Sequence, residues 1–333
     1  MKNIFFLFLS SICFLGFTVF PSCNPRHITN QDSLSVFSLY KLQPVKQMNA
    51  EHVRSLASNL IGQDFNAQYF VSNDSAMNYK GKDASSYFSI NNQTSFWSFS
   101  KNIDRYFGNF TPQLPDDKEA ARIANNFLSK NKLMPADQQQ VHLVHSGGLR
   151  GQAAKSLTTK DVYRTLNFSR VLDSLPVIGP GSRIIVHVGD KGEITGATYR
   201  WREVESVKGQ RLKKAEVKSE EEARREAQKI IASEFGANTE ITINKIYSAY
   251  FDQGVNYIQP IYAIEANAVI VGEDNNKLSI PYLCMVEAMK QTPEQITIRN
   301  IDPRAKEIIK GSKKGTGNQG NQDSIQLKHR SDD

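Results

Sequence analysis

The chain has 333 residues, with 41 Lys and Arg against 34 Asp and Glu and a formal net charge of +7. Basic residues are interspersed with acidic ones throughout the chain, and no run of basic residues is stacked with aromatic ones, so binding to nucleic acid is not expected. A chain of this length can bury a sizeable core and usually forms more than one domain.

The first 23 residues have the pattern of an export signal. Lys2 precedes an apolar run over residues 4–20, and the small Ser22 stands directly before Cys23. This order of a basic end, an apolar stretch and a small residue predicts a signal peptide over residues 1–22. The run Phe-Pro-Ser-Cys at residues 20–23 resembles a lipobox, in which the signal peptide is cleaved directly before the cysteine. This resemblance implies a lipid anchor on Cys23. Two alternatives stay open, namely an uncleaved membrane-spanning helix and ordinary secretion with cleavage nearby.

Cysteine usage excludes an intramolecular disulfide in the expected mature chain. Cys13 belongs to the signal and Cys23 would carry the lipid, which leaves Cys284 alone. Cys284 lies in an apolar, strand-like run, and this setting predicts a buried and unreactive thiol.

Both ends of the exported chain are polar. Residues 23–44 are expected to form a lipidated tether between the anchor and the folded body, because the segment shows no clear period. Residues 311–333 are rich in Gly, Asn, Gln and charge, and their composition predicts a disordered tail.

Three segments combine helical periodicity with a capping residue. The first covers residues 50–61 after Asn49, and the second follows Asp116. The third begins after Ser219, where the run Ser-Glu-Glu-Glu has the pattern of a capping box, and ends at Gly236. Each segment predicts an amphipathic helix.

Strand patterns follow each predicted helix. In chain order they cover residues 67–72, 87–91, 95–99, 140–145, 161–171, 182–188, 193–204, 240–251, 256–268 and 278–288. The run Gly-Asp-Lys-Gly at 189–192 separates two of them and predicts a tight hairpin, whereas residues 146–159 are expected to form a long loop. A sheet formed by such consecutive strands must bury its apolar face against the helix that precedes it.

The sequence therefore predicts an α+β fold of two or three repeated units, each an amphipathic helix packed on an antiparallel sheet. The expected units are an N-terminal α+β unit at residues 45–110, a second unit at 116–206 and a third at 217–300.

Within the second unit, Tyr163-Arg164 leads to Leu-Pro-Val-Ile-Gly-Pro-Gly-Ser at residues 175–182 and then to Val-His-Val-Gly-Asp-Lys-Gly-Glu-Ile at residues 186–194. This order resembles PepSY-like domains, including those in the propeptides of thermolysin-type metalloproteases. The third helix and the strand that begins at Pro260 also match the family pattern. The resemblance covers about residues 116–300 and implies a non-catalytic extracytoplasmic module that binds or restrains a protein partner, for example a protease acting in trans.

No motif for catalysis or metal binding is found. His142 and His145 lie three residues apart on a strand pattern and so point to opposite faces, and no His-Glu-x-x-His run is present. The glycine-rich turn at residues 179–182 lacks the residue order of a nucleophile elbow. We therefore predict no enzyme, no cofactor and no metal. The alternative is an enzyme whose site gathers several of His142, His145, His187, Asp190 and Glu193.

One aromatic and basic cluster, Tyr-Arg-Trp-Arg at residues 199–202, is a candidate binding surface. On a strand its side chains alternate, so Tyr199 and Trp201 share one face while Arg200 and Arg202 share the other. One interpretation is a buried aromatic pair with a solvated arginine edge. The other makes Arg200 and Arg202 part of a surface for an anionic ligand or a partner.

Phe96 and Trp97 are a second candidate for an exposed partner surface, because the first unit is poor in apolar residues. The sequence predicts a bacterial cell-envelope lipoprotein, attached to a membrane through a lipid on Cys23, whose body lies outside the cytoplasm and binds a protein or peptide partner. Pairing at sheet edges would suit this role. A structural subunit of an envelope or surface assembly is the alternative.

Overall fold

The computed structural model describes residues 34–62, 70–73, 75–81, 85–106, 110–152, 159–271 and 277–296. The predicted signal peptide, Cys23 and the predicted tail at residues 311–333 lie outside the described residues. Within the described ranges, no helix has both the length and the apolar composition needed to cross a membrane.

The described residues form three α-helices, and each helix begins directly after its predicted capping residue. The helices are α1 (Ala50–Ile61), α2 (Asp117–Lys130) and α3 (Glu220–Phe235). The side chains of Asn49 and Asp116 each accept a hydrogen bond from the backbone N–H three residues on, at 2.9 and 2.8 Å. Ser219 and Glu222 form the capping box. The helix predictions are confirmed because they depend on short-range contacts that the sequence contains.

Strands account for most of the regular structure. They are β1 (Leu34–Lys41), β2 (Phe70–Ser72), β3 (Ala76–Lys80), β4 (Tyr87–Asn91), β5 (Trp97–Ser100), β6 (Val141–Gln152), β7 (Thr159–Leu172), β8 (Leu175–Ile178), β9 (Arg183–Val188), β10 (Ile194–Arg200), β11 (Gln210–Lys213), β12 (Glu240–Asp252), β13 (Tyr257–Val271) and β14 (Lys277–Glu287).

The predicted fold of repeated helix-on-sheet units is wrong. Among the described residues, fourteen strands form one mixed sheet in the order β11-β1-β13-β12-β8-β7-β9-β10-β5-β4-β3-β2, with β6 beside β7 and β14 beside β13, and 47% of these residues lie in strands. The prediction failed because it treated strands as local to the helix before them. Instead β5, from the first expected unit, pairs with β10 from the second, and β8 pairs in parallel with β12 from the third.

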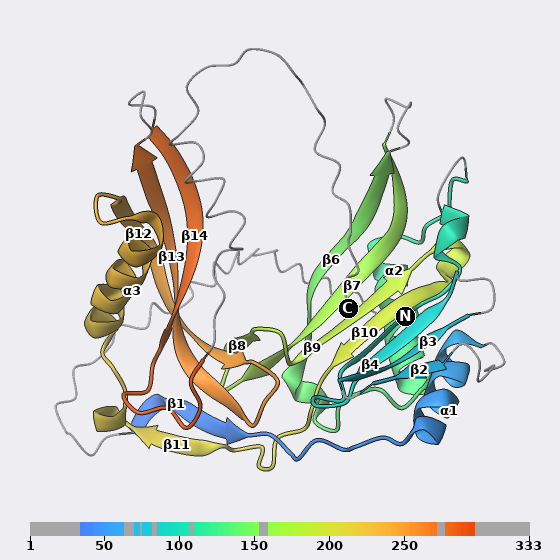
Figure 1. Ribbon diagram of the computed structural model, residues 1–333, viewed down its shortest axis with the longest axis horizontal. Coiled ribbons are helices and arrows are strands. Elements are labelled where there is room, and N and C mark those ends of the chain that lie inside the picture. Colours follow the sequence, from blue (N-terminus) through green and yellow to red (C-terminus); the bar gives the residue numbers. More distant parts are fainter. Residues whose placement is uncertain are drawn as a thin grey trace, which may run out of the picture.

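Figure 1 shows two upright parts of this sheet. We call β2 to β7, β9 and β10 the eight-strand half, and β12, β13 and β14 the three-strand half. The short strand β8 joins them, since it pairs with β7 on one side and with β12 on the other. Along the base, β1 pairs with β11 and, through Tyr40 and Lys41, with β13.

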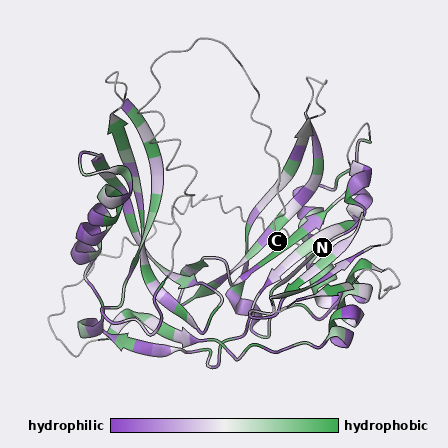
Figure 2. Ribbon diagram, viewed as in Figure 1, coloured by the Kyte–Doolittle hydropathy of each residue, from purple (hydrophilic) through white to green (hydrophobic). Residues whose placement is uncertain are grey.

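Both helices of the eight-strand half cover the same face of its sheet. The apolar side chains on that face form rows across the paired strands, one of which is Tyr79, Phe88, Phe99, Ala197, Val186 and Leu166. Helix α1 packs on the β3 to β5 end of this face, and α2 packs on the β7 and β9 end. The opposite face therefore lies away from both helices, and Figure 2 shows the alternation of hydrophobic and hydrophilic positions along these strands.

Helix α3 covers one face of the three-strand half. Ala227 and Ile231 pack against Ile264, Cys284 and Val286, and the hydrophilic side of α3 faces outward in Figure 2. Cys284 is fully buried, as predicted, and its burial raises the pKa of its thiol to about 12. A thiol that stays protonated is a poor nucleophile.

Two segments expected to be irregular are strands. Residues 34–42 were assigned to the tether, but β1 pairs with two neighbours and buries Phe37, Tyr40 and Leu42. The predicted long loop at 146–159 is also wrong, because β6 continues to Gln152 and β7 begins at Thr159. In β1 burial does not follow residue type, because Ser35 and Ser38 are buried while Leu34 and Val36 are exposed. In β6, Gly147 and Gly148 interrupt the strand pattern.

Candidate functional site

The face of the eight-strand half that lies away from α1 and α2 carries polar side chains, and we call it the polar face. A cross-strand row on it runs from β3 to β6 and consists of Asn78, Ser89, Ser98, Thr198, Ile185, Asn167 and His145. Six of these seven are polar, and all but His145 are half-buried. The carbonyl oxygen of the Asn167 side chain is buried without a hydrogen-bond partner among the described residues.

A second row on the polar face is basic. Arg200 of β10 lies directly opposite Arg183 of β9, which in turn lies opposite Ser169 of β7 and, through it, His142 of β6. Among the described residues, neither arginine takes part in an ion pair. Arg200 is a residue expected at a binding surface from the sequence and Arg183 is not, although the predicted hairpin at residues 189–192 places the two on adjacent strands.

A pocket of about 390 Å³ opens on the polar face beside Arg200. Ser89, Ser98 and Thr198 contribute to it from three adjacent strands, and the loops that carry Pro180 and Gln253 also contribute. No Asp or Glu is among the residues that line this pocket. Apart from the exposed guanidinium of Arg200, the lining is uncharged and rich in hydroxyl and amide groups.

Phe96 and Trp97 lie at this pocket but have different roles. Trp97 is 5% exposed, and its ring stacks on Tyr199 at 5.2 Å between centroids and on Phe88 at 6.0 Å. The prediction that Trp97 belongs to an exposed partner surface is therefore wrong, because it packs in the core below α1. Phe96 is half-buried, lines the pocket and lies close to Gly254.

The other predicted arginine, Arg202, lies in the junction between the two halves. Strand β10 ends at Arg200, so Arg202 does not share a strand face with it. The Arg202 guanidinium donates to the carbonyl oxygen of Val255. Its neighbour Trp201 is buried beneath Arg170, whose guanidinium carbon lies 4.0 Å from the centre of the indole.

Arg170 and Asp252 are the charged groups buried at this junction. Arg170 is 0% exposed, and its Nη2 donates to the carbonyl oxygen of Arg202 at 2.6 Å. Asp252 accepts hydrogen bonds from Ser182 Oγ at 2.6 Å and from the Gly254 amide at 2.8 Å. Burial lowers the pKa of Arg170 to about 10 and raises the pKa of Asp252, while their opposite charges offset part of both shifts. This arrangement joins β7 to β12 and is structural.

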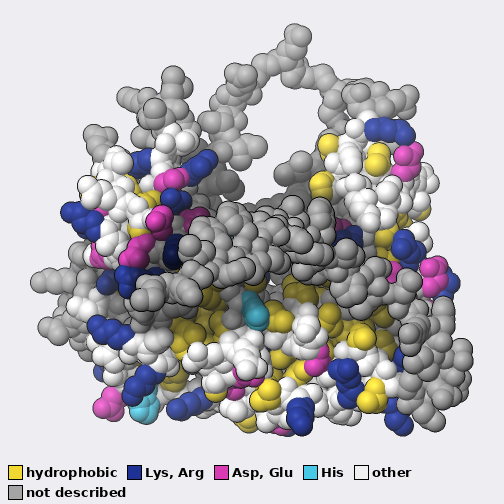
Figure 3. All heavy atoms as spheres, turned by 180° about the vertical axis from the view of Figure 1, so that it is seen from behind, with side chains coloured by type: hydrophobic (Ala, Val, Ile, Leu, Met, Phe, Trp, Pro, Cys, Tyr) yellow, Lys and Arg dark blue, Asp and Glu magenta, His cyan; other side chains and the backbone are white. Residues whose placement is uncertain are grey.

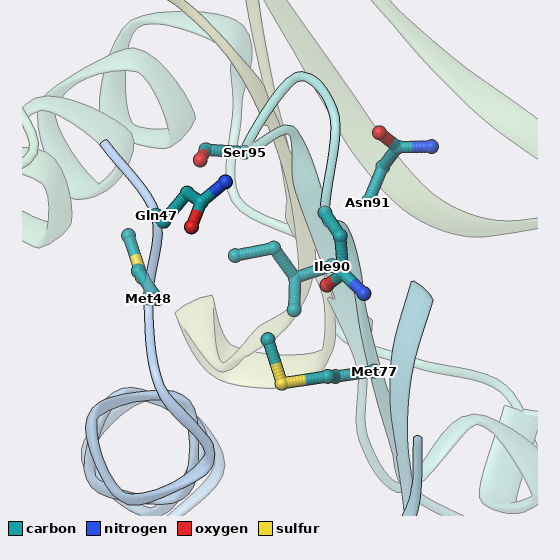
Figure 4. A pocket seen from close by; sticks show the side chains of 7 residues that line it. Gln47, Met48, Met77, Ile90, Asn91 and Ser95 are labelled. Atoms are coloured by element: carbon teal, nitrogen blue, oxygen red, sulfur yellow. The ribbon is translucent and has the colours of Figure 1, made fainter. Parts of the chain in front are cut away.

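A smaller pocket of about 270 Å³ lies next to the first, between the segment before α1 and strands β3 and β4. Figure 4 shows Met77 and Ile90 pointing toward Met48, with Gln47 above them. Asn91 points away from these apolar side chains, because its Oδ1 accepts hydrogen bonds from the turn that joins β4 to β5. The pocket is thus mixed, with three apolar side chains and four polar residues in its lining, and it fits a group of side-chain size.

The residues of the alternative enzyme site do not form one group. Asp190 and Glu193 lie close together, because Arg105 is ion-paired with both, at 2.8 and 3.6 Å. Asp190 accepts hydrogen bonds from Arg105 Nη2 at 2.8 Å and from the Gln113 amide at 2.7 Å, both in the segment before α2. His187 lies on the polar face in β9, whereas His142 and His145 lie on the same face in β6, and His142 also lines a separate pocket near Asp173. Within the described ranges, no three His, Cys, Asp or Glu side chains form a group suited to a metal ion.

Figure 3 shows acidic and basic side chains interspersed on the face seen from behind.

His187 should make stability depend on pH. Burial lowers the pKa of His187 in the folded protein to about 4. In the unfolded chain the same imidazole binds a proton near pH 6.5, so between these two pH values only the unfolded state is protonated. Stability is therefore full above pH 6.5 and is lost as the pH falls, and we expect the free energy of unfolding to drop by about 1 to 2 kcal/mol between pH 7 and pH 5. Urea unfolding at both pH values measures this drop.

The variant His187→Gln should remove most of this pH dependence. His145→Gln, at an exposed position of the same face, is the matched control and should keep it. An equal drop in His187→Gln and in the wild type would show that other groups cause it.

Comparison with models of known protein families finds no match, and no curated protein matches the chain. The fold is similar to that of a crystal structure of an uncharacterized protein from Eubacterium rectale. The TM-score is 0.43 at 11% sequence identity, over 80% of this chain and 88% of that one. A likeness at this level carries no argument about function. The resemblance to PepSY-like domains therefore stays a prediction.

Proposed function

We propose that this protein is a non-catalytic binding lipoprotein of the bacterial cell envelope, which takes up an extended segment of a protein partner as an added strand on β6. The envelope location and the lipid on Cys23 are supported by the pattern of residues 1–23. The resemblance to PepSY-like domains also favours a module that binds or restrains a protein, including a protease. The observation that carries the proposal is that one edge of strand β6 pairs with no other described strand.

Strand β6 is long and pairs on one side. Among the described residues its neighbour is β7, and the backbone groups on its other side meet no strand. Leu143, Val144 and Leu149 on β6 are 42%, 55% and 43% exposed. An added strand gains main-chain hydrogen bonds from such an edge, and apolar side chains beside it supply further contact.

The other sheet edges are less suited to receive a strand. Strand β2 has three residues and β11 has four, and short edges offer few backbone groups. Strand β14 has eleven residues but contains Pro281, which has no N–H to donate. Strand β6 is interrupted by register shifts near Val144 and Arg150, yet the positions from His145 to Leu149 pair in unbroken register with β7.

The proposal predicts that lysines on β6 weaken peptide binding at least tenfold. A display library of random ten-residue peptides is selected on the full-length protein, and the affinity of the enriched peptides is measured. The double variant L143K/L149K should lose binding, since two charges beside the edge oppose an apolar strand. L278K/L283K places the same charges on β14, where the leucines are 61% and 42% exposed, and should bind as the wild type does.

Equal loss of binding in both double variants, or no enriched peptide, would overturn the proposal. Sedimentation of the full-length protein is measured in parallel, because β6 of a second copy could occupy the same edge. Self-association that L143K/L149K abolishes, with no peptide bound, would instead favour the structural-subunit alternative.

A further inference from the structure

The facing pair Arg183 and Arg200 is an unusual arrangement in a sheet. Their positions are directly opposite in the antiparallel ladder of β9 and β10, where the Cβ atoms of paired residues lie about 5 Å apart. Like charges at such positions repel each other and destabilise the sheet. Within the described part of the chain no carboxylate lies within ion-pair distance of either side chain, so their repulsion is not relieved there.

The surroundings of the pair favour an anionic ligand. Nε of Arg183 is buried and has no hydrogen-bond partner among the described residues. Arg200 is exposed and lines the 390 Å³ pocket, where Ser98 and Thr198 add hydroxyl groups and no acidic residue is present. Guanidinium groups recognise carboxylates through paired, charge-assisted hydrogen bonds.

The pair is also connected to the β6 edge. The row of Arg200, Arg183, Ser169 and His142 crosses from β10 to β6 on one face. A strand added beside β6 would lie four strand spacings from β10, or about 19 Å. An extended chain covers about 3.3 Å per residue, so about six residues reach from the added strand to the arginines.

We infer that Arg183 and Arg200 bind the carboxylate of an acidic side chain in the partner segment, about six residues away from the strand that pairs with β6. This inference rests on the proposed function for its location, while the arginine site itself is independent of strand addition. The partner is thereby defined as a polypeptide with an apolar strand and an acidic side chain about six residues from it.

The test measures binding of a labelled hexaglutamate peptide to the full-length protein, with hexaglutamine as the uncharged probe. Hexaglutamate should bind at least tenfold more tightly than hexaglutamine. Arg200→Gln should weaken hexaglutamate binding at least tenfold, and Arg183→Gln should do the same. Arg200 is exposed, so its variant should fold even if the Arg183 variant does not.

Lys229→Gln on the exposed side of α3 is the matched control, because it removes one positive charge from the three-strand half. It should change hexaglutamate binding less than twofold, as should L143K/L149K. Equal weakening by Lys229→Gln and Arg200→Gln, or equal binding of the two peptides, would overturn the inference. If L143K/L149K loses binding of the selected apolar peptides but still binds hexaglutamate, the β6 edge and the arginine pair are independent sites. Each proposal can therefore fail without the other.

Discussion

Replacing Arg170 with alanine is expected to lower the free energy of unfolding by about 3 to 5 kcal/mol. The side chain is fully buried between the two halves and covers the indole of Trp201. Its loss opens a cavity above that ring, leaves the Arg202 carbonyl oxygen without its donor and removes a positive charge that favours the ionised form of buried Asp252. A buried charge that loses its compensating partner is costly because water cannot reach it.

Urea unfolding followed by tryptophan fluorescence measures this effect, since the chain has two tryptophans and one of them, Trp201, touches Arg170. Arg164→Ala is the matched control on the same strand. Arg164 is half-buried and lies 3.8 Å from Asp117 in the one ion pair it forms among the described residues, so its loss should cost less than about 1 kcal/mol. Equal costs for the two variants would show that Arg170 does not hold the junction together.

Replacing Trp97 with alanine should likewise cost about 3 to 5 kcal/mol of stability. Its indole is almost parallel to the Tyr199 ring, at 7°, and also stacks on Phe88 and Phe99. Such stacked rings bury large apolar areas, and the space cannot be refilled by small movements of neighbouring strands. Urea unfolding measures the cost.

Phe96→Ala is the control for this prediction. Phe96 is the neighbouring residue on the chain, is half-buried and lines the pocket on the polar face, so its removal should cost about 1 kcal/mol. If Trp97→Ala folded as stably as the wild type and lost peptide binding instead, Trp97 would be a surface residue after all.

The helices could be predicted because their signals are short-range. Asn49, Asp116 and Ser219 each bond a backbone N–H three residues on, so a window of four residues contains the whole interaction. The hairpin at residues 189–192 was predicted for the same reason, and Lys191 and Gly192 adopt the positive φ values that such a turn needs.

The arrangement of the strands could not be predicted in the same way. Residues 175–178 contain a proline and are absent from the strands expected from the sequence, yet they form β8, which links β7 to β12 over more than 70 positions of the chain. The register Tyr250 with Val177 has no local signal in either segment. Only pairing across the whole chain shows that the three expected units share one sheet.

The candidate site was predicted in part. Arg200 lines the pocket on the polar face, but without Arg202 beside it, and the adjacent residues Phe96 and Trp97 differ in burial although they were expected to form one exposed surface. Side chains of successive strand residues point to opposite faces, so this rule alone would have separated the two. The edge at β6 was missed because Gly147 and Gly148 interrupt its strand pattern, and these residues were assigned to a loop.

The most direct test of the proposed function is amide hydrogen exchange in the full-length protein with and without a selected peptide. Strand addition on β6 predicts at least tenfold slower exchange within residues 145–149 when the peptide is bound, with no change in Lys277–Glu287 of β14. Unchanged exchange at residues 145–149, or protection at β14 instead, would contradict the account.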